Sequence, residues 1–338
     1  MKNAAIIGVG AMGLRHLIAY KNIPEINIVA VCDINQESLN KIKKENPKIN
    51  IYTNFKNMLE KEKIDIVSVA TLGPTHAEIV IELANNKIPY IFCEKPMATS
   101  VKDAEQMIQV CKTNNSKIAI NHVKRFMPSY LKVKELIQQN KIGKISSILA
   151  FQGGGRLGSM GTHMIDLFNF LYGKTPKSIA GKIDKNYTGD HKKRDVVDPG
   201  GFLTLDYGEG QKAHLDVSEN LGIPGLVIIV GSVGRMIVDE KKGIRVESRS
   251  EEDFEKRLGE YNLPLSNIED YETPREFVET ITERHIKKLL SDEDYCTAEE
   301  GLRAVEVILA THISSIKNTK VNLPLNDKEF EVRITWLE

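Results

Sequence analysis

The sequence predicts a doubly wound parallel α/β domain followed by an α+β domain with an open, mostly antiparallel sheet. The chain has 338 residues, which suggests two domains at roughly 100–200 residues each. Strand and helix patterns alternate up to about residue 120, as in parallel βαβ units, and strand patterns then follow one another. We therefore expect one domain over 1–121 and a second over 122–338. An alternative for the last helix is that it packs back on the first domain.

Short apolar runs rich in β-branched residues predict the strands of the first domain. Two of its helices begin with capping-box pairs, Thr75 with Glu78 and Ser100 with Asp103, in which hydroxyl and carboxylate each accept a bond from an unpaired amide. The expected strands cover 4–7, 26–32, 49–52, 64–70, 90–93 and 117–121, and the expected helices cover 11–21, 36–45, 75–86 and 100–114.

In the second domain the pattern changes to strands in succession, interrupted by few helices. A proline near the start of the first helix and a glycine beyond its end support that helix. The expected helices cover 128–139, 162–171 and 298–316, and the expected strands cover 145–151, 178–183, 202–207, 212–217, 227–230 and 236–238.

The composition excludes several classes of protein. Lys and Arg (46) balance Asp and Glu (46), which argues against a protein that coats nucleic acid phosphates. The longest uncharged stretch, 220–234, falls short of the ~20 residues needed to span a bilayer. The N-terminus has no signal-peptide pattern, and the four cysteines form no C-x-x-C pair. We expect a cytoplasmic protein with no nucleic acid or membrane partner.

A glycine-rich sequence ends the first expected strand and opens the first expected helix. It consists of Gly8, Val9, Gly10, Ala11, Met12 and Gly13. In this G-x-G-x-x-G pattern the first glycine permits a tight turn, the second lets the backbone approach a pyrophosphate, and the third permits close helix–strand packing. The helix N-terminus then offers its amides to the phosphates. The motif predicts a Rossmann domain with all six residues at the cofactor.

Asp33 ends the second expected strand, twenty residues after the glycine-rich sequence. A carboxylate at this point accepts a hydrogen bond from the ribose 2′-hydroxyl of NAD and repels the 2′-phosphate of NADP. The next residues, Ile34, Asn35 and Gln36, include no arginine or lysine. We therefore expect NAD rather than NADP.

Glu94, Lys95 and Pro96 follow the fifth expected strand. The carboxyl ends of the strands face the ligand crevice in a doubly wound sheet, so Lys95 is expected near the nicotinamide. Pro96 restricts Lys95 to extended conformations and so fixes its direction. A surface lysine at a strand end is the alternative interpretation.

With these motifs the chain resembles the Gfo/Idh/MocA family of glucose–fructose oxidoreductases and inositol dehydrogenases. The resemblance covers essentially the whole chain and rests on segments 8–13, 94–96, 121–126, 161–166 and 298–324. It implies a dinucleotide-binding Rossmann domain over 1–121, a substrate-binding and oligomerisation domain over 122–338 whose open sheet often forms dimers or tetramers, and a Lys-Pro bond that is commonly cis. It also implies oxidation or reduction of a sugar, cyclitol or nucleotide-sugar.

The resemblance implies that Lys95 and His163 are catalytic. His163 would take the hydroxyl proton as the hydride leaves for nicotinamide, which suits histidine because its pKa lies near operating pH. Lys95 would position the same hydroxyl and stabilise developing negative charge. The sequence departs from the family at Ser159, where an aspartate is usual. Asp166 is an alternative orienting carboxylate, although we favour an exposed or helix-packing role for it.

Further site residues are expected through the resemblance. The loop after the fourth strand, 71–76, departs from the family's Thr-Pro-Asn-x-x-His but keeps its threonine and histidine. Two arginines at the substrate would favour an anionic substrate such as a nucleotide-sugar or a sugar acid. The expected additional cofactor residues are Thr71, Leu72, His76, Glu94 and Lys95, and the expected substrate residues are Asn121, Arg125, Arg156 and Ser159.

Two other functions stay open from the sequence. One is a glycosidase that uses tightly held NAD for transient oxidation. The other is a non-catalytic NAD-sensing module, which the change at Ser159 favours and the retained Lys95 and His163 oppose. We expect no metal centre, because His163 and Asp166 have no third ligand next to them in the sequence. The expected partners are a small sugar-like molecule and further copies of the chain, as a homodimer or homotetramer.

Overall fold

The structure, a computed structural model, describes residues 1–184, 198–254, 256 and 265–326, which form two compact units. The first contains 1–123 and 277–305, and the second contains 124–276 and 306–326. The observed division differs from the expected one at residue 121 in one respect, because residues 277–305 belong to the first unit. The reason is that Ile286 and Leu289 of a C-terminal helix lie in the hydrophobic core of that unit.

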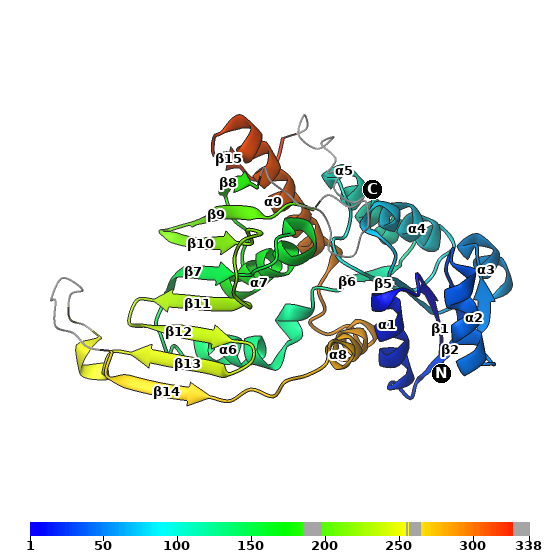
Figure 1. Ribbon diagram of the computed structural model, residues 1–338, viewed down its shortest axis with the longest axis horizontal. Helices are drawn as coiled ribbons and strands as arrows, with labels where there is room; N and C mark the ends of the chain where they lie inside the picture. The colour runs from blue at the N-terminus through cyan, green and yellow to red at the C-terminus, as the bar shows by residue number, and fades with distance from the viewer. Residues whose placement is uncertain (185–197, 255, 257–264, 327–338) are drawn as a thin grey trace. The chain divides into compact units, whose positions relative to one another are not determined.

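The first unit has a parallel sheet in the order β3-β2-β1-β4-β5-β6, with helices packed on it (Figure 1). This is the Rossmann order, which reverses between β1 and β4. The strands are β1 (Lys2–Ile7), β2 (Ile26–Cys32), β3 (Asn50–Tyr52), β4 (Ile66–Val69), β5 (Tyr90–Cys93) and β6 (Lys117–Ile120), and the helices are α1 (Ala11–Lys21), α2 (Gln36–Glu45), α3 (Phe55–Lys61), α4 (Gly73–Asn85), α5 (Val101–Thr113) and α8 (Val278–Ser291).

One of the two capping boxes is confirmed. The Ser100 hydroxyl accepts from the Asp103 amide at 3.0 Å, so Ser100 caps α5 as predicted. Thr75 is not a cap, because α4 begins two residues earlier, at Gly73, and its N-cap is Leu72. Pro74 lies in the first turn, where its fixed φ suits a helix and its missing amide leaves no bond unmade. The Thr75 hydroxyl instead donates to the Leu72 carbonyl and lies within the helix.

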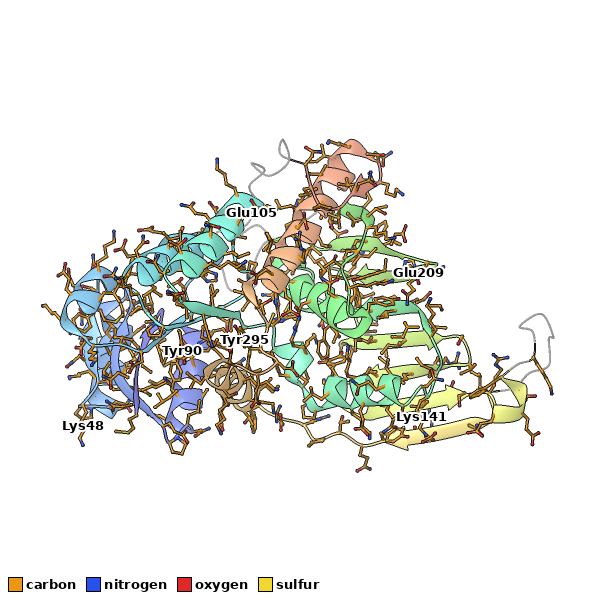
Figure 2. All side chains as sticks on the ribbon, turned by 180° about the vertical axis from the view of Figure 1, so that it is seen from behind. Lys48, Tyr90, Glu105, Lys141, Glu209 and Tyr295 are labelled. Carbon is orange, nitrogen blue, oxygen red and sulfur yellow. The ribbon has the colours of Figure 1, made fainter. Side chains whose placement is uncertain are left out.

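The sequence did not predict α3 or α8. The buried residues of α8, which include Thr282 and His285, recur at helical spacing, so its amphipathic pattern is present in the sequence although the helix was not predicted. The helix is held by packing against α1 and against the edge of the sheet. Tyr90 and Tyr295, labelled in Figure 2, are partly buried against the same core.

The second unit is a nine-stranded sheet in the order β14-β13-β12-β11-β7-β10-β9-β8-β15, in which only β7 and β10 pair in parallel. The predicted fold class is confirmed, although β13 and β14 were not expected. The strands are β7 (Ile145–Phe151), β8 (Ser178–Ile183), β9 (Gly201–Gly208), β10 (Gln211–Asp216), β11 (Leu226–Gly231), β12 (Gly234–Asp239), β13 (Gly243–Ser248), β14 (Asn267–Tyr271) and β15 (Val321–Asn322).

Buried and partly exposed side chains alternate along these strands, which buries one face of the sheet. The helical elements of this unit are η1 (Val123–Phe126), α6 (Pro128–Gln138), the π-helical turn η2 (Leu157–Gly161), α7 (Thr162–Tyr172), η3 (Glu251–Asp253) and the C-terminal part of α9 (Ala298–Lys317), which begins in the first unit. Within the described residues, none of the helices combines the length and the apolar character that a membrane span requires.

Candidate active site

The glycine-rich turn lies at the carboxyl edge of the parallel sheet, where the strand order reverses between β1 and β4. Gly8 has a φ of +86°, and a Cβ on it would lie 2.7 Å from the carbonyl carbon of Ala70, just after β4. A Cβ on Gly13 would lie 1.9 Å from the Gly8 carbonyl oxygen, so α1 packs directly on the turn. These contacts allow no side chain at either position.

Gly10 differs from its two neighbours in the motif. A Cβ built on it meets no described atom within 4 Å, so the space beside its backbone is open. Gly10 is the N-cap of α1, with no side-chain cap and no acidic residue in the first turn. The first amides of α1, near Ala11 and Met12, therefore form the kind of helix N-terminus that binds a phosphate group.

Asp33 follows β2 and is tied to the glycine-rich turn. One carboxylate oxygen accepts from the Val9 amide at 2.7 Å, and the other accepts from the Asn35 amide at 2.8 Å. Each carboxylate oxygen has a second lone pair for a further donor. The side chain is thus fixed beside the turn, with acceptor capacity for ribose hydroxyls.

The loop after β4 is joined to the segment after β5 through His76. Its Nδ1 lies 2.9 Å from the Pro96 carbonyl oxygen, and its Nε2 lies 3.1 Å from the Thr71 carbonyl oxygen. Burial lowers the pKa of His76, and the two carbonyls oppose that shift. The imidazole is wholly buried, whereas the side chain of Leu72 is 48% exposed.

Glu94 is buried at the end of β5 and accepts three hydrogen bonds. Its Oε1 lies 2.8 Å from His16 Nε2 and 2.7 Å from Asn121 Nδ2, and its Oε2 accepts from the Lys95 amide at 3.3 Å. Burial raises the pKa of Glu94, but His16, the charge of Lys95 and the Asn121 amide together lower it to about 2. The carboxylate is therefore charged at neutral pH and holds the backbone of Lys95.

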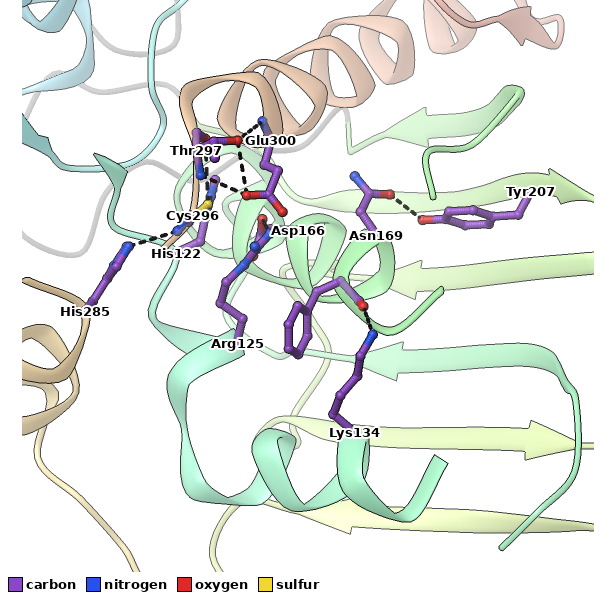
Figure 3. A network of polar contacts seen from close by, with 11 residues as sticks. His122, Arg125, Lys134, Asp166, Asn169, Tyr207, His285, Cys296, Thr297 and Glu300 are labelled. Atoms are coloured by element: carbon purple, nitrogen blue, oxygen red, sulfur yellow. Dashed lines mark hydrogen bonds and ion pairs between the residues drawn. The ribbon is translucent and has the colours of Figure 1, made fainter. Parts of the chain in front are cut away.

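The Lys95–Pro96 bond is cis, as the resemblance implies. Asn121, at the end of β6, is wholly buried, and its Oδ1 lies 3.4 Å from His285 Nδ1. His285 Nε2 in turn accepts from the Cys296 amide at 3.1 Å (Figure 3). No sequence motif pointed to either His16 or His285, since one lies alone within a helix and the other lies 164 residues beyond Asn121.

In the second unit, His163 is the second residue of α7 and is 8% exposed. The turn η2 leads directly into α7, and a buried carboxylate caps it. Asp198 accepts from the Gly158 amide and from the Ser159 amide, both at 2.8 Å. An acidic group therefore lies at the backbone of Ser159, one turn before His163. Sequence reasoning missed Asp198 because it follows Ser159 by 39 residues.

Asp166 pairs with Arg125 in a bidentate ion pair (Figure 3). The Nε–Oδ2 distance is 2.9 Å, and the two side chains are 5% and 1% exposed. Of the exposed or helix-packing role expected for Asp166, exposure is wrong: the carboxylate is buried, because Arg125 on η1 balances its charge. Arg156 stands just before η2 with a left-handed φ of +68°, and its Nε is buried without a hydrogen-bond partner among the described residues.

Two family models match the chain. One describes an oxidoreductase family with an NAD-binding Rossmann fold and matches residues 2–122, and the other describes the GFO/IDH/MocA C-terminal domain and matches 149–237. Among the similar proteins is the 2,7-anhydro-N-acetylneuraminate hydratase of Escherichia coli, 26% identical over 81% of this chain and 80% of the relative. The myo-inositol 2-dehydrogenase of Thermotoga maritima is 24% identical over 69% of this chain and 74% of the relative.

Solved structures share the fold over nearly the whole chain. An oxidoreductase from Agrobacterium radiobacter in complex with NAD⁺, L-tartaric acid and magnesium has a TM-score of 0.79, at 18% identity over 95% of this chain and 98% of that one. The WlbA dehydrogenase from Bordetella pertussis, in complex with NADH and UDP-GlcNAcA, has a TM-score of 0.75 at 18% identity, over 96% and 99%. The chain therefore belongs to the Gfo/Idh/MocA family of oxidoreductases and is an enzyme with an NAD-binding Rossmann domain.

Proposed function

We propose that this enzyme transfers a hydride between NAD and a secondary alcohol carbon of a sugar, cyclitol or nucleotide-sugar. The observation that carries the proposal is the fixed position of Lys95. Its amide is held by the charged Glu94 at the carboxyl edge of the sheet, the edge that also carries the glycine-rich turn and Asp33. In a Rossmann sheet this is the edge at which the cofactor binds.

Lys95 and His163 are the proposed catalytic residues. Oxidation of a secondary alcohol needs a base that takes the hydroxyl proton while the hydride leaves, and the imidazole of His163 has the right chemistry. The ammonium group of Lys95 orients the hydroxyl and stabilises the negative charge that develops on its oxygen. The carboxylate of Asp198 at the Ser159 amide supports the helix entrance that carries His163.

The proposed cofactor is NAD rather than NADP. The carboxylate of Asp33 is held beside the turn by two backbone amides, so it cannot swing away from a 2′-phosphate without breaking both bonds. The six residues of the glycine-rich turn, together with Thr71, Leu72, Glu94 and Lys95, are the proposed cofactor contacts. NAD supplies the hydride acceptor when bound. We assign His76 a positioning role, since both of its ring nitrogens face backbone carbonyls.

The proposed substrate class rests on the relatives and on the polar residues near the catalytic ones. Relatives are named for myo-inositol and for D-apiose, a cyclitol and a sugar. Arg156 and Ser159 are the proposed substrate contacts in the second unit. Arg125 is paired with Asp166, so its charge is balanced and its contribution is to position α7. Asn121 is buried and positions Glu94.

A second candidate function is favoured by one relative. The Escherichia coli protein is named a hydratase, and addition or removal of water involves no net oxidation. An enzyme of that kind, or a glycosidase with transient oxidation, would take a hydride onto NAD and return it within one turnover. The same Lys95 and His163 chemistry would serve, and NADH would not accumulate.

One experiment separates these functions. The protein is incubated with NAD and a panel of cyclitols, sugars and nucleotide-sugars, and NADH and product are followed together. NADH that accumulates in step with product, and is lost in Lys95→Ala, supports the dehydrogenase. Product without NADH supports the redox-neutral enzyme, and NAD binding without turnover on any substrate supports a sensing module. Failure to bind NAD contradicts all three functions.

We also propose that the enzyme is cytoplasmic and forms a homodimer or homotetramer through the outer face of the nine-stranded sheet. Leu149, Ile228 and Ile237 are register partners on β7, β11 and β12, so their side chains lie on one face. All three are partly exposed, and Phe202 on β9 is 52% exposed. An apolar row of this kind is typical of an interface between subunits.

A further inference from the structure

A buried histidine on α1 belongs to none of the sequence motifs. His16 lies on α1, is 0% exposed, and places its Nε2 at 2.8 Å from Glu94 Oε1. A carboxylate that carries a charge only accepts hydrogen bonds, so Nε2 must carry the proton and donate. The other ring nitrogen, Nδ1, is buried with no hydrogen-bond partner among the described residues. Among the described residues, the imidazole of His16 therefore has one hydrogen-bond partner, Glu94.

The carboxylate of Glu94 links His16 to the backbone of Lys95. Oε1 takes the bonds from His16 and Asn121, and Oε2 accepts from the Lys95 amide. With both donors present, the carboxylate has one orientation that satisfies all three partners. Without His16, the buried carboxylate loses a donor and is free to rotate toward other partners. The lowered pKa of Glu94 means that the group stays charged throughout the working range of an enzyme.

The opposite side of the network is fixed in the same way. The Cys296 amide donates to His285 Nε2, so His285 Nδ1 carries the proton and donates to Asn121 Oδ1. This leaves Asn121 Nδ2 to donate to Glu94, as observed. The rings of His16 and His285 both meet the Phe92 ring edge-on, with centroids 5.4 Å and 4.9 Å away. Each donor has one consistent direction, so the network has a single arrangement.

We propose that His16 is a positioning residue for Lys95, acting through the carboxylate of Glu94. The helix that carries His16 is the one whose N-terminus follows the glycine-rich turn, so the contact links the cofactor-binding helix to the lysine of the hydroxyl site. This inference rests on the proposed role of Lys95. It makes α1 serve two purposes: its first turn offers amides to the cofactor, and its second turn orients the segment that carries Lys95.

The test compares three replacements of His16. His16→Gln keeps an amide donor near the place of Nε2, whereas His16→Leu removes the donor and His16→Asn is too short to reach Glu94. We expect kcat to fall by about 10-fold or more in the Leu and Asn variants and to stay within about 3-fold of wild type in the Gln variant. The Kd of NAD should change by less than about 3-fold in all three, since the glycine-rich turn is untouched. His312→Gln, at a half-buried histidine of α9, is the matched control.

A second readout does not depend on turnover. The rate at which an amine-reactive reagent modifies Lys95 is measured by mass spectrometry of the Lys95 peptide, relative to an exposed lysine such as Lys41. We expect this ratio to change in His16→Leu and His16→Asn and to be retained in His16→Gln. A histidine that only stabilises the core would leave the ratio unchanged once folded protein is selected by NAD binding.

Several outcomes overturn the inference. Wild-type kcat in His16→Leu or His16→Asn would contradict it, as would an equal loss in His16→Gln. In a Lys95→Met background His16→Leu should lower the residual rate no further, and a further full loss would mean that His16 acts independently of Lys95. Should His16→Leu fail to fold, the Asn variant and the labelling ratio carry the test. If Lys95→Met itself retains full activity, the proposed function fails, and that result is distinct from failure of the His16 link.

Discussion

Single residues at the carboxyl edge of the parallel sheet combine a structural bond with a proposed chemical role. Asp33 accepts from two backbone amides and leaves lone pairs for ribose hydroxyls. Glu94 accepts from two side chains and from the backbone of Lys95. In both cases the groups that fix the carboxylate are donors, which keeps it charged and correctly oriented.

Removing the charge of Asp33 should reduce the preference for NAD. In Asp33→Asn the 2′-phosphate of NADP is no longer repelled, and a hydrogen bond to a charged acceptor is lost. We expect kcat/KM with NAD to fall by about 10-fold, in line with roughly 1.5–3 kcal/mol for such a bond, and the NADP to NAD ratio to rise. Steady-state kinetics with both cofactors measure this change.

Asp65→Asn is the matched control for this prediction. Asp65 also accepts from a backbone amide, that of Asn3 at 2.7 Å, but it precedes β4 and so lies at the opposite edge of the sheet. Its replacement should leave the cofactor ratio unchanged. An unchanged ratio in Asp33→Asn would contradict the assigned role.

The lowered pKa of Glu94 predicts how stability depends on pH. Because its pKa is about 2 in the folded protein and 4.5 ordinarily, the carboxylate stabilises the fold above about pH 4.5 and loses this contribution as pH falls toward 2. The full contribution is on the order of 3 kcal/mol. Denaturant unfolding at neutral and at acid pH should show a larger loss for wild type than for Glu94→Gln. Equal losses would mean that Glu94 does not titrate as described.

Residues within contiguous motifs were predictable, and their partners were not. Lys95 and Asp33 stand at fixed distances from recognisable strands and glycines, so a single sequence identifies them. His16, His285 and Asp198 act through contacts with residues far along the chain, and nothing next to them in the sequence marks these contacts. The ion pair that buries Asp166 was not predictable for the same reason, because its partner Arg125 lies 41 residues away.

At the scale of elements, the turn between β1 and α1 separates packing from binding. Gly13 has no room for a side chain because the Gly8 carbonyl is in contact with it, whereas Gly10 borders open space. The motif predicts different roles for the two glycines. The contacts of Gly13 are those of close helix–strand packing, and the open space beside Gly10 is where we propose that the cofactor binds.

Alanine substitutions at these two glycines should therefore behave differently. Gly10→Ala should retain the melting temperature of wild type within a few degrees, since its φ of −69° is open to alanine, and should raise the Kd of NAD by about 10-fold or more. Gly13→Ala should raise the Kd of NAD and, unlike Gly10→Ala, also lower the melting temperature, because the added methyl group displaces α1. Calorimetry and titration with NAD measure both. A stable Gly13→Ala, or a Gly10→Ala with normal NAD affinity, would contradict the assignment.

Elements next to recognisable motifs or turn residues were predictable, even where, as in α1, the helix is only weakly amphipathic. The helices α1 and α2 and the strands β2, β5, β7 and β8 have the predicted bounds. The helix α8 was not predicted, although its buried residues recur at helical spacing. The edge strand β14 has an exposed isoleucine and two adjacent acidic residues, so its local pattern does not indicate a strand, and it forms by pairing with β13.

At the scale of the whole molecule, the proposed assembly surface lies on the second unit. The apolar row around Ile228 on the sheet is the proposed subunit interface. Ile228→Lys should convert the oligomer to monomers, because a charge buried at an apolar interface without a partner opposes association. Light scattering after size exclusion measures the mass. Ile316→Lys, at an isoleucine of α9 that is 83% exposed, is the control, and a wild type that is already monomeric would contradict the proposal.

The alternation of strands and helices stops near residue 121, and this predicts where the chain first passes from one unit to the other. It does not predict that 277–305 belong to the first unit. The chain passes to the second unit again within a continuous helix, α9, whose amphipathic pattern shows no break. Only the contacts of α8 with the first core reveal that 277–305 belong there.

The central claim is that Lys95 acts at the reacting hydroxyl on a preformed NAD site. The most direct test measures the Kd of NAD and kcat for wild type and for Lys95→Met, which keeps the side-chain length and removes the ammonium group. The account predicts a Kd within about 3-fold of wild type and a kcat lower by at least ~100-fold, the usual contribution of a donor that stabilises negative charge developing in the transition state. A Lys95→Met enzyme that binds NAD normally and turns over at the wild-type rate would contradict it.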